Sequence, residues 1–195
     1  MRARNDLQSG LRRRWIAAAI CAAACATAPV RAQFAPDESI TLERRIKAAF
    51  VFKFASFVEW PPGTFAQADT PIQIAVMGDA AMAQDIAEAS MNRTVEGRRI
   101  QVRQVDAGEP LDGVNILFLR DAAAEQLGAF EDLKPDAMLI VTESADALHR
   151  GSIINFLLDG GKVRFDISLD AADKRGIRLS SRLITVARQV AGRPR

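Results

Sequence analysis

The sequence has few of the side chains that carry covalent or metal chemistry. Among its 195 residues there are two cysteines and one histidine, and tyrosine is absent. Both cysteines, Cys21 and Cys25, lie near the amino terminus, in a segment that we expect to be removed. The remaining chain would then have no disulfide, no thiol nucleophile and no thiolate metal ligand. Its folding would have to rely on an apolar core.

Catalytic motifs are also missing from the sequence. It contains no nucleophile elbow, no Walker loop and no dinucleotide-binding glycine fingerprint. Aspartate, glutamate and histidine do not occur at the spacings of metal ligands. The single histidine, His149 in "ADALHRGS", is more typical of a loop residue than of a catalytic base. We therefore predict a protein that is not an enzyme and has no catalytic residue, cofactor or metal site.

The amino terminus has the pattern of a secretory signal peptide. Five arginines between Arg2 and Arg14 precede the short apolar run "WIAAAICAAACATA", and the small residues Val30 and Ala32 follow it. We predict cleavage after Ala32 and a periplasmic protein. One alternative is an uncleaved anchor, although the apolar run is short for a membrane span. Another is a lipoprotein modified at Cys25, although the leucine usual before such a cysteine is absent.

The apparent basic character of the chain belongs to this signal. The whole sequence has 26 basic and 24 acidic residues, but residues 1–32 hold six of the basic and one of the acidic ones. Their removal leaves 20 basic and 23 acidic residues, a net charge of about −3. This charge gives no support to a nucleic-acid partner. No later apolar run is long enough for a membrane span, so we expect no membrane insertion after cleavage.

The rest of the chain alternates between strands and helices. We predict a flexible leader over 33–40, a single domain over 41–190 and a disordered tail over 191–195. The predicted strands cover 72–79, 95–105, 114–120 and 137–144, a hairpin through "DGGK" covers 152–170, and helices cover 80–91, 122–133 and 179–190. This order predicts a three-layer α/β fold. Its central sheet would be mostly parallel, with an antiparallel edge hairpin and helices on both faces.

An unusually apolar helix is expected to open the domain. It would begin near Ser39 or Thr41 and end at Pro61 and Pro62, after the run "AAFVFKFASFVEW". The apolar residues exceed what one helical stripe can place in a core, so part of the surplus is available to a partner. The residues predicted to bind that partner are Val51, Phe52, Phe54, Phe57 and Trp60.

A group of polar residues in the last quarter is the best candidate for a ligand site. Two antiparallel strands and the start of the last helix could bring these residues together. They are Asn155, Arg164, Asp166, Arg178 and Ser180. The structural alternative is an Arg–Asp pair on an exposed sheet face and a serine that caps a helix.

In order and spacing, several motifs resemble the YfiR-like family of exported bacterial proteins. The most specific are "F-x-x-F-x-x-W-P" from Phe54 to Pro61, and "VRFDI" leading to "GIRLSS" near the carboxyl terminus. The resemblance covers about residues 41–190. It implies a periplasmic regulator that inhibits a membrane-bound diguanylate cyclase by contacting its periplasmic portion, and so lowers cyclic di-GMP and biofilm formation. Some members carry disulfides, which the mature part of this chain cannot form.

Two classes of function therefore stay open. The first is a regulator whose partner is a membrane-bound sensor. Such a regulator could also form a homodimer. The second is a periplasmic small-ligand-binding or sensor protein that acts on another membrane receptor or kinase. In an open α/β sheet its ligand would be expected at the carboxyl ends of the parallel strands.

Overall fold

The structure, a computed structural model, describes residues 36–121, 123 and 137–192. Along the chain the elements are α1 (Pro36–Phe54), η1 (Ala55–Phe57), β1 (Val58–Glu59), β2 (Ile72–Met77), α2 (Ala80–Ser90), β3 (Thr94–Val95), β4 (Arg98–Val105), β5 (Ile116–Leu119), β6 (Leu139–Thr142), η3 (Ala147–Arg150), β7 (Ile154–Asp159), β8 (Lys162–Ser168), α4 (Leu169–Lys174), β9 (Arg178–Leu179), α5 (Ser181–Val186) and β10 (Gln189–Ala191).

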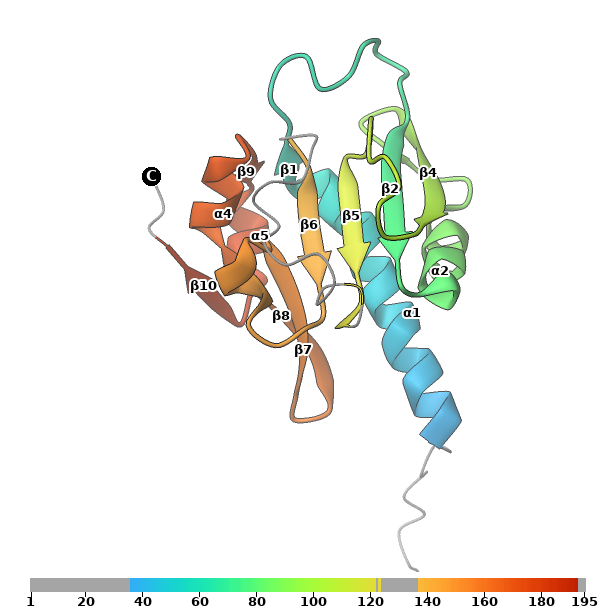
Figure 1. Ribbon diagram of the computed structural model, residues 1–195, viewed down its shortest axis with the longest axis vertical. Coiled ribbons are helices and arrows are strands. Elements are labelled where there is room, and N and C mark those ends of the chain that lie inside the picture. The colour runs from blue at the N-terminus through green and yellow to red at the C-terminus, as the bar shows by residue number, and fades with distance from the viewer. Residues whose placement is uncertain (1–35, 122, 124–136, 193–195) are drawn as a thin grey trace, which may run out of the picture. The chain divides into compact units, whose positions relative to one another are not determined.

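Eight strands form one sheet in the order β10-β8-β7-β6-β5-β2-β4-β3 (Figure 1). Its centre from β4 to β7 is parallel, whereas β8 runs antiparallel to β7 and β3 runs antiparallel to β4. Every residue of β5 and β6 is buried, as expected for central strands that are covered on both faces. The predicted α/β fold with a mostly parallel sheet is confirmed.

The β7–β8 hairpin forms where the sequence predicted it. Its turn residues Gly160 and Gly161 have positive φ angles of 56° and 74°, the backbone conformation that a two-residue type I′ turn requires. The hairpin is not the edge of the sheet, however, because β10 pairs in parallel with β8.

This edge strand replaces the end of the predicted last helix. α5 ends at Val186, and Ala187 turns the chain into an extended conformation. The amide of Arg188 then donates to the carbonyl oxygen of Phe165 at 2.9 Å, and the next three residues pair with β8. The open edge of β8 offers these residues backbone partners, which favours a strand over another turn of exposed helix.

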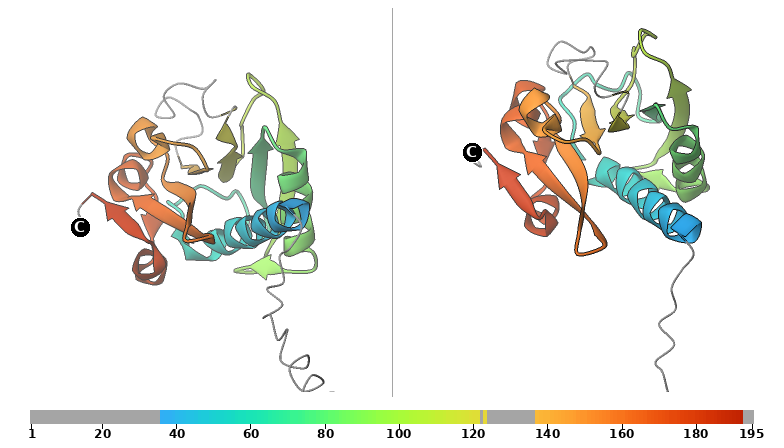
Figure 2. Two further views of the ribbon diagram at one scale, coloured as in Figure 1. Left: turned by 90° about the horizontal axis from the view of Figure 1, so that it is seen from below. Right: turned by 60° about the horizontal axis from the view of Figure 1, so that its bottom comes forward.

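Helices α1 and α2 lie side by side on one face of the sheet (Figure 2). Phe50 and Phe54 of α1 meet Phe156 and Phe165 of the hairpin, with ring centroids 5.2 Å apart for Phe54 and Phe165. These four rings, which we call the aromatic cluster, join the first helix to the last third of the chain. The helical period predicted for the opening segment is confirmed over α1.

The ends of the opening helix differ from the prediction. α1 begins at Pro36, so residues 36–40 are helical and are not a flexible leader. It ends at Phe54, and after η1 the chain continues as β1. Val58 pairs with Leu179 in an antiparallel two-stranded sheet, and the amide of Ser180 donates to the carbonyl oxygen of Phe57. These backbone bonds end the helix before Pro61 is reached.

A second apolar cluster lies on the other face of the sheet. Met77, Leu117, Leu119 and Ile140 point to this side and pack with Ala147 of η3. The helix predicted over 122–133 lies outside the described residues except for Ala123, which belongs to this cluster. In the part of the chain that the structure describes, no helix is both long and apolar enough to cross a membrane.

Candidate functional site

Large apolar side chains are exposed mainly at one end of the fold. Helix α1 and the β7–β8 hairpin both project past the carboxyl ends of β2, β5 and β6 (Figure 1). Ile40, Leu42 and Ile46 of α1 and Leu158 of the hairpin have exposed fractions between 38% and 58%. We call these four side chains the apolar end. Among the other described residues, only Met91 and Val186 are large apolar residues with an exposed side chain.

The apolar end continues the aromatic cluster outward. Ile46 lies one helical turn before Phe50, and Leu158 lies two residues after Phe156 on the same face of β7. Ile40 lies two residues before Leu42 and therefore on a different side of α1. Exposed apolar side chains that adjoin a buried cluster, as Ile46 and Leu158 do, are more typical of a contact surface than scattered exposed residues are.

Ion pairs hold the amino-terminal half of α1 against the domain. Arg44 Nε lies 2.6 Å from Asp85 Oδ2 of α2. Lys47 Nζ lies 2.5 Å from Glu43 Oε1, and 2.6 Å from Oε2 of Glu143, which follows β6. Lys47 and Asp85 are both buried. Charge pairing therefore fixes the half of α1 that carries three of the four side chains of the apolar end.

The electrostatic balance at Lys47 favours its charged form. Burial lowers the pKa of Lys47, but the hydrogen bonds and the charges of Glu143 and Glu43 together outweigh burial, and the pKa lies above its usual value of 10.5. Lys47 is thus a charged group at any physiological pH. Its contribution to stability is lost only in strongly alkaline solution, when the pH rises through the raised pKa.

In the loop after β2, both carboxylate oxygens of Asp79 make structural interactions. Asp79 caps α2, with its Oδ1 accepting from the amide of Met82 at 2.9 Å. Its Oδ2 lies 3.2 Å from Nη1 of Arg120, which follows β5. A carboxylate at this position disfavours an anion at the start of α2.

A row of polar side chains crosses four neighbouring strands on the face opposite α1. Thr142 of β6, Asn155 of β7, Asp166 of β8 and Gln189 of β10 are successive register partners, so they lie beside one another on the same face. We call them the polar row. Asn155 Oδ1 accepts from Thr142 Oγ1 at 2.7 Å and from the amide of Ser144 at 3.1 Å.

The carboxylate of the polar row, Asp166, is neutralised by an arginine that was not predicted as a site residue. Arg188 donates to Asp166 through both Nε and Nη2, the first bond being 2.9 Å long. This bidentate pair raises the pKa of Arg188 through its hydrogen bonds and the charge of Asp166. It also ties the start of β10 to β8.

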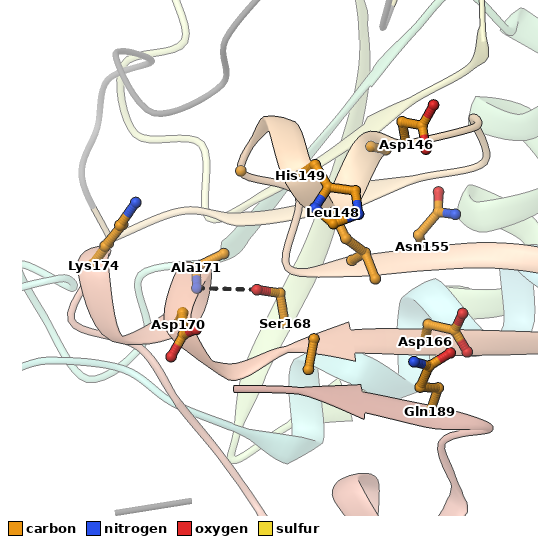
Figure 3. Close-up of a pocket in the computed structure, with 13 residues that line it drawn as sticks. Asp146, Leu148, His149, Asn155, Asp166, Ser168, Asp170, Ala171, Lys174 and Gln189 are labelled. Atoms are coloured by element: carbon orange, nitrogen blue, oxygen red, sulfur yellow. Dashed lines mark hydrogen bonds between the residues drawn. The ribbon is translucent and has the colours of Figure 1, made fainter. Parts of the chain in front are cut away.

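Asn155, Asp166 and Gln189 of the polar row line one wall of a cavity of about 540 Å³. In Figure 3 Asn155, Asp166 and Gln189 lie on one side, His149 and Leu148 lie above, and Asp170 and Lys174 lie at the opposite end. Asp146, before η3, has a positive φ of 57°. The cavity combines side chains from η3, three adjacent strands and α4.

Comparison with known proteins identifies the family. The profile of the family described as YfiR/HmsC-like matches residues 44–188. The chain belongs to the YfiR/HmsC-like family. A search among curated proteins finds no match. The matched region extends from within α1 to Arg188, so it includes the aromatic cluster and most of the polar row. Membership indicates a periplasmic regulator in cyclic di-GMP signalling, as the sequence resemblance implied.

In this YfiR/HmsC-like protein the predicted partner-binding residues do not share one surface. Val51, Phe52 and Phe54 are buried in the core, with exposed fractions of 8% or less. Phe57 and Trp60 are half-buried, and Trp60 packs edge-on against Phe65. The prediction that Val51 and Phe52 contact the partner was wrong. Helix α2 and the sheet together cover a wider part of the α1 surface than a single apolar stripe would fill.

The predicted ligand residues separate into two places. Asn155 and Asp166 face each other across β7 and β8 and line the cavity in Figure 3. Arg178 and Ser180 line a different cavity of about 460 Å³ beside α4, β9 and α5. Ser180 caps α5 through a 3.4 Å bond from the amide of Leu183, as the structural alternative predicted. Arg164 is exposed and lines neither cavity.

Sequence reasoning missed Gln189 and Arg188 because it placed both on a helix. It missed the apolar end because Leu42 and Ile46 belong to the stripe that was assigned to the core. The length of the stripe was a usable signal, because α1 is longer than the sheet strands that it covers.

Proposed function

We propose that this protein is a periplasmic inhibitor that binds the periplasmic portion of a membrane-bound diguanylate cyclase and so lowers cyclic di-GMP in the cell. It acts by binding and has no catalytic step. The signal pattern of residues 1–32, with cleavage after Ala32, would deliver it to that compartment. Membership of the YfiR/HmsC-like family supports the role.

The observation that carries the proposal is the apolar end. Its four side chains lie on two elements that project from the same end of the sheet, and ion pairs of Arg44 and Lys47 fix one of those elements. A preformed apolar surface loses little conformational entropy when it docks, which favours affinity. The exposed charged residue Arg45 lies beside it on α1 and would belong to a polar rim.

Inhibition follows from unequal affinity for two states of the sensor. If the protein binds the inactive state about tenfold more tightly than the active one, saturation shifts their equilibrium about tenfold toward inactivity. About 1.4 kcal/mol of differential binding energy is enough for this shift. A few apolar contacts that exist in only one sensor state can supply it.

The experiment is deletion of the gene followed by complementation, with cyclic di-GMP measured in cell extracts. Deletion should raise cyclic di-GMP, and the wild-type gene should restore the lower amount. The Ile46→Ser/Leu158→Ser double variant should fold, because both side chains are exposed, and should fail to restore it. Met91→Ser/Val186→Ser is the control, since these side chains are also apolar and even more exposed but lie at the end of α2 and on α5.

Two outcomes would contradict the proposal in different ways. Unchanged cyclic di-GMP after deletion, in conditions where the protein is made, would remove the cyclase as the target. Full complementation by the Ile46→Ser/Leu158→Ser variant would keep the target but show that the contact surface lies elsewhere.

A further inference from the structure

The outer side of β4 is an open sheet edge over most of its length. β4 pairs with β2 from Ile100 to Val105, whereas β3 pairs only with Arg98 and Arg99 at its start. Within the described part of the chain no other strand pairs with this side, and β4 lies near one margin of the sheet in Figure 1. Such an edge is a template to which a further strand can add.

The pairing on the inner side of β4 shows which of its backbone groups point outward. The carbonyl oxygen of Met77 accepts from the amide of Arg120, so Met77 directs its backbone groups toward β5 and the preceding residue, Val76, directs them toward β4. Val76 is in register with Gln104, and in a parallel pair it bonds to the residues on either side of that partner. Every second residue of β4 therefore has its N–H and C=O groups on the open side. These residues are Ile100, Val102 and Gln104.

The two faces of β4 differ in character along this edge. On the α2 face, Ile100 and Val102 are half-buried and line a cavity of about 380 Å³ beside the end of α2, with no carboxylate in its lining. On the opposite face, Arg99 is exposed and makes no side-chain hydrogen bond or ion pair within the described residues. Arg103 lies on the same face and donates to a backbone carbonyl oxygen of the following loop, so it keeps its positive charge. β4 itself contains no acidic residue.

We propose that the open edge of β4 binds an extended segment of a partner protein in which acidic and apolar residues alternate. The segment would add as an antiparallel strand, the direction that β3 already has beside β4. Its apolar side chains would enter the cavity beside α2, and its carboxylates would meet Arg99 and Arg103. The site goes beyond the proposed inhibitory role, because it includes none of the four side chains of the apolar end.

A second copy of this chain fits the same edge less well. Two β4 strands that pair antiparallel about a two-fold axis show the same face to the same side. Both copies of Arg99 and Arg103 would then lie together on one face, where like charges disfavour pairing. An acidic segment replaces that repulsion with attraction.

The test is fluorescence anisotropy of the purified protein in low salt with a labelled, end-blocked peptide of about seven residues that alternates glutamate and valine. This peptide should bind, and the matching lysine–valine peptide should bind about tenfold more weakly or not at all. Methyl groups on the valine nitrogens should weaken binding about tenfold, because in the antiparallel arrangement these N–H groups donate to β4. Methyl groups on the glutamate nitrogens, which point to solvent, should leave binding unchanged.

Variants and amide exchange then locate the site. Gln104→Pro removes an outward N–H at an exposed position, which an edge strand tolerates, and should weaken binding about tenfold, whereas Gln104→Ala keeps the N–H and should not. Arg99→Glu should weaken binding of the glutamate peptide and strengthen that of the lysine peptide, and it needs no change of backbone. Arg164→Glu, at an exposed arginine of β8, is the matched control. In exchange measured by NMR, the peptide should slow the amides of Val102 and Gln104.

Several results would overturn the inference. They are the absence of binding up to about 1 mM glutamate peptide, equal binding of the glutamate and lysine peptides, and equal binding of the two methylated peptides. A dimer in sedimentation that Gln104→Pro converts to a monomer would also overturn it, by showing that a second copy occupies the edge. All are measured on purified protein, so they stay separate from the cyclic di-GMP measurements that test the inhibitory role.

Discussion

Replacing Lys47 with methionine tests the ion pairs that hold α1. The side chain is nearly enclosed, with 10% of its surface exposed, and its ammonium group contacts the carboxylates of Glu43 and Glu143. Methionine keeps the length and the apolar stem but removes the charge. The two carboxylates are then left near each other without the cation between them.

The expected loss of stability is about 2 to 3 kcal/mol. Removing one partner of a fully buried pair costs about 3 to 5 kcal/mol. The loss should be smaller here, because Glu43 is 28% exposed and Glu143 also has Arg120 at 3.5 Å. For a domain of this size the loss corresponds to a fall in Tm of about 5 to 10 °C. Adding Glu143→Gln to Lys47→Met should recover part of it by removing one uncompensated charge.

The assay is urea unfolding of the wild type, Lys47→Met and the control Lys53→Met between pH 7 and pH 11.5. Lys53 lies on the same helix but is exposed, so its replacement should change stability little. The pKa of Lys47 is raised in the folded state, so its stabilisation is fully present below 10.5 and is lost as the pH rises through the folded pKa. The gap between wild type and Lys47→Met should therefore be constant to about pH 10 and narrow above it.

A gap below about 0.5 kcal/mol at pH 7 would refute the reasoning, since it would equal that of an ordinary surface substitution. A gap that widens above pH 10.5 would refute the sign of the pKa shift. The absence of tyrosine from the chain keeps phenol ionisation out of this pH range.

Other substitutions separate core from surface. Phe52→Ser should lower the free energy of unfolding, measured in urea, by about 3 kcal/mol or more, because Phe52 is only 8% exposed. Leu42→Ser should change it by less than about 1 kcal/mol. Similar losses for both variants would contradict the placement of the core boundary on α1. Gly78→Ala should lower Tm more than Gly97→Ala. Both glycines have φ near +80°, but only at Gly78 would a new Cβ lie 2.9 Å from Cβ of Ala123, and equal shifts in Tm would argue against that close approach.

The sequence predicted the central part of the fold well, for a physical reason. β5 and β6 are short continuous apolar runs between turn residues, and their shortness and β-branched content favour buried strands over helices. The β7–β8 turn needs two residues with positive φ, and Gly160–Gly161 supplies them at the predicted place. These elements are specified by nearby residues alone.

The errors occur where long-range pairing decides the local structure. Residues 187–190 have a helical pattern, but pairing with the free edge of β8 makes Gln189 and Val190 part of β10. Residues 58–59 were predicted within the opening helix, but pairing with β9 makes them a strand. The prediction that Asn155 and Asp166 lie together was correct, because both belong to one hairpin. The positions of Arg178 and Ser180 depend instead on the direction that the chain takes after α4.

The aromatic cluster has a consequence for how the chain folds after export. Its rings come from α1 and from the β7–β8 hairpin, which are about a hundred residues apart in sequence. The first helix to reach the periplasm therefore exposes Phe50 and Phe54 until nearly the whole chain has followed. Closing so long a loop delays core formation, and an apolar helix left open in that interval is prone to aggregate. We expect the yield of folded protein to depend on periplasmic holding chaperones more strongly than the modest size of the domain would suggest.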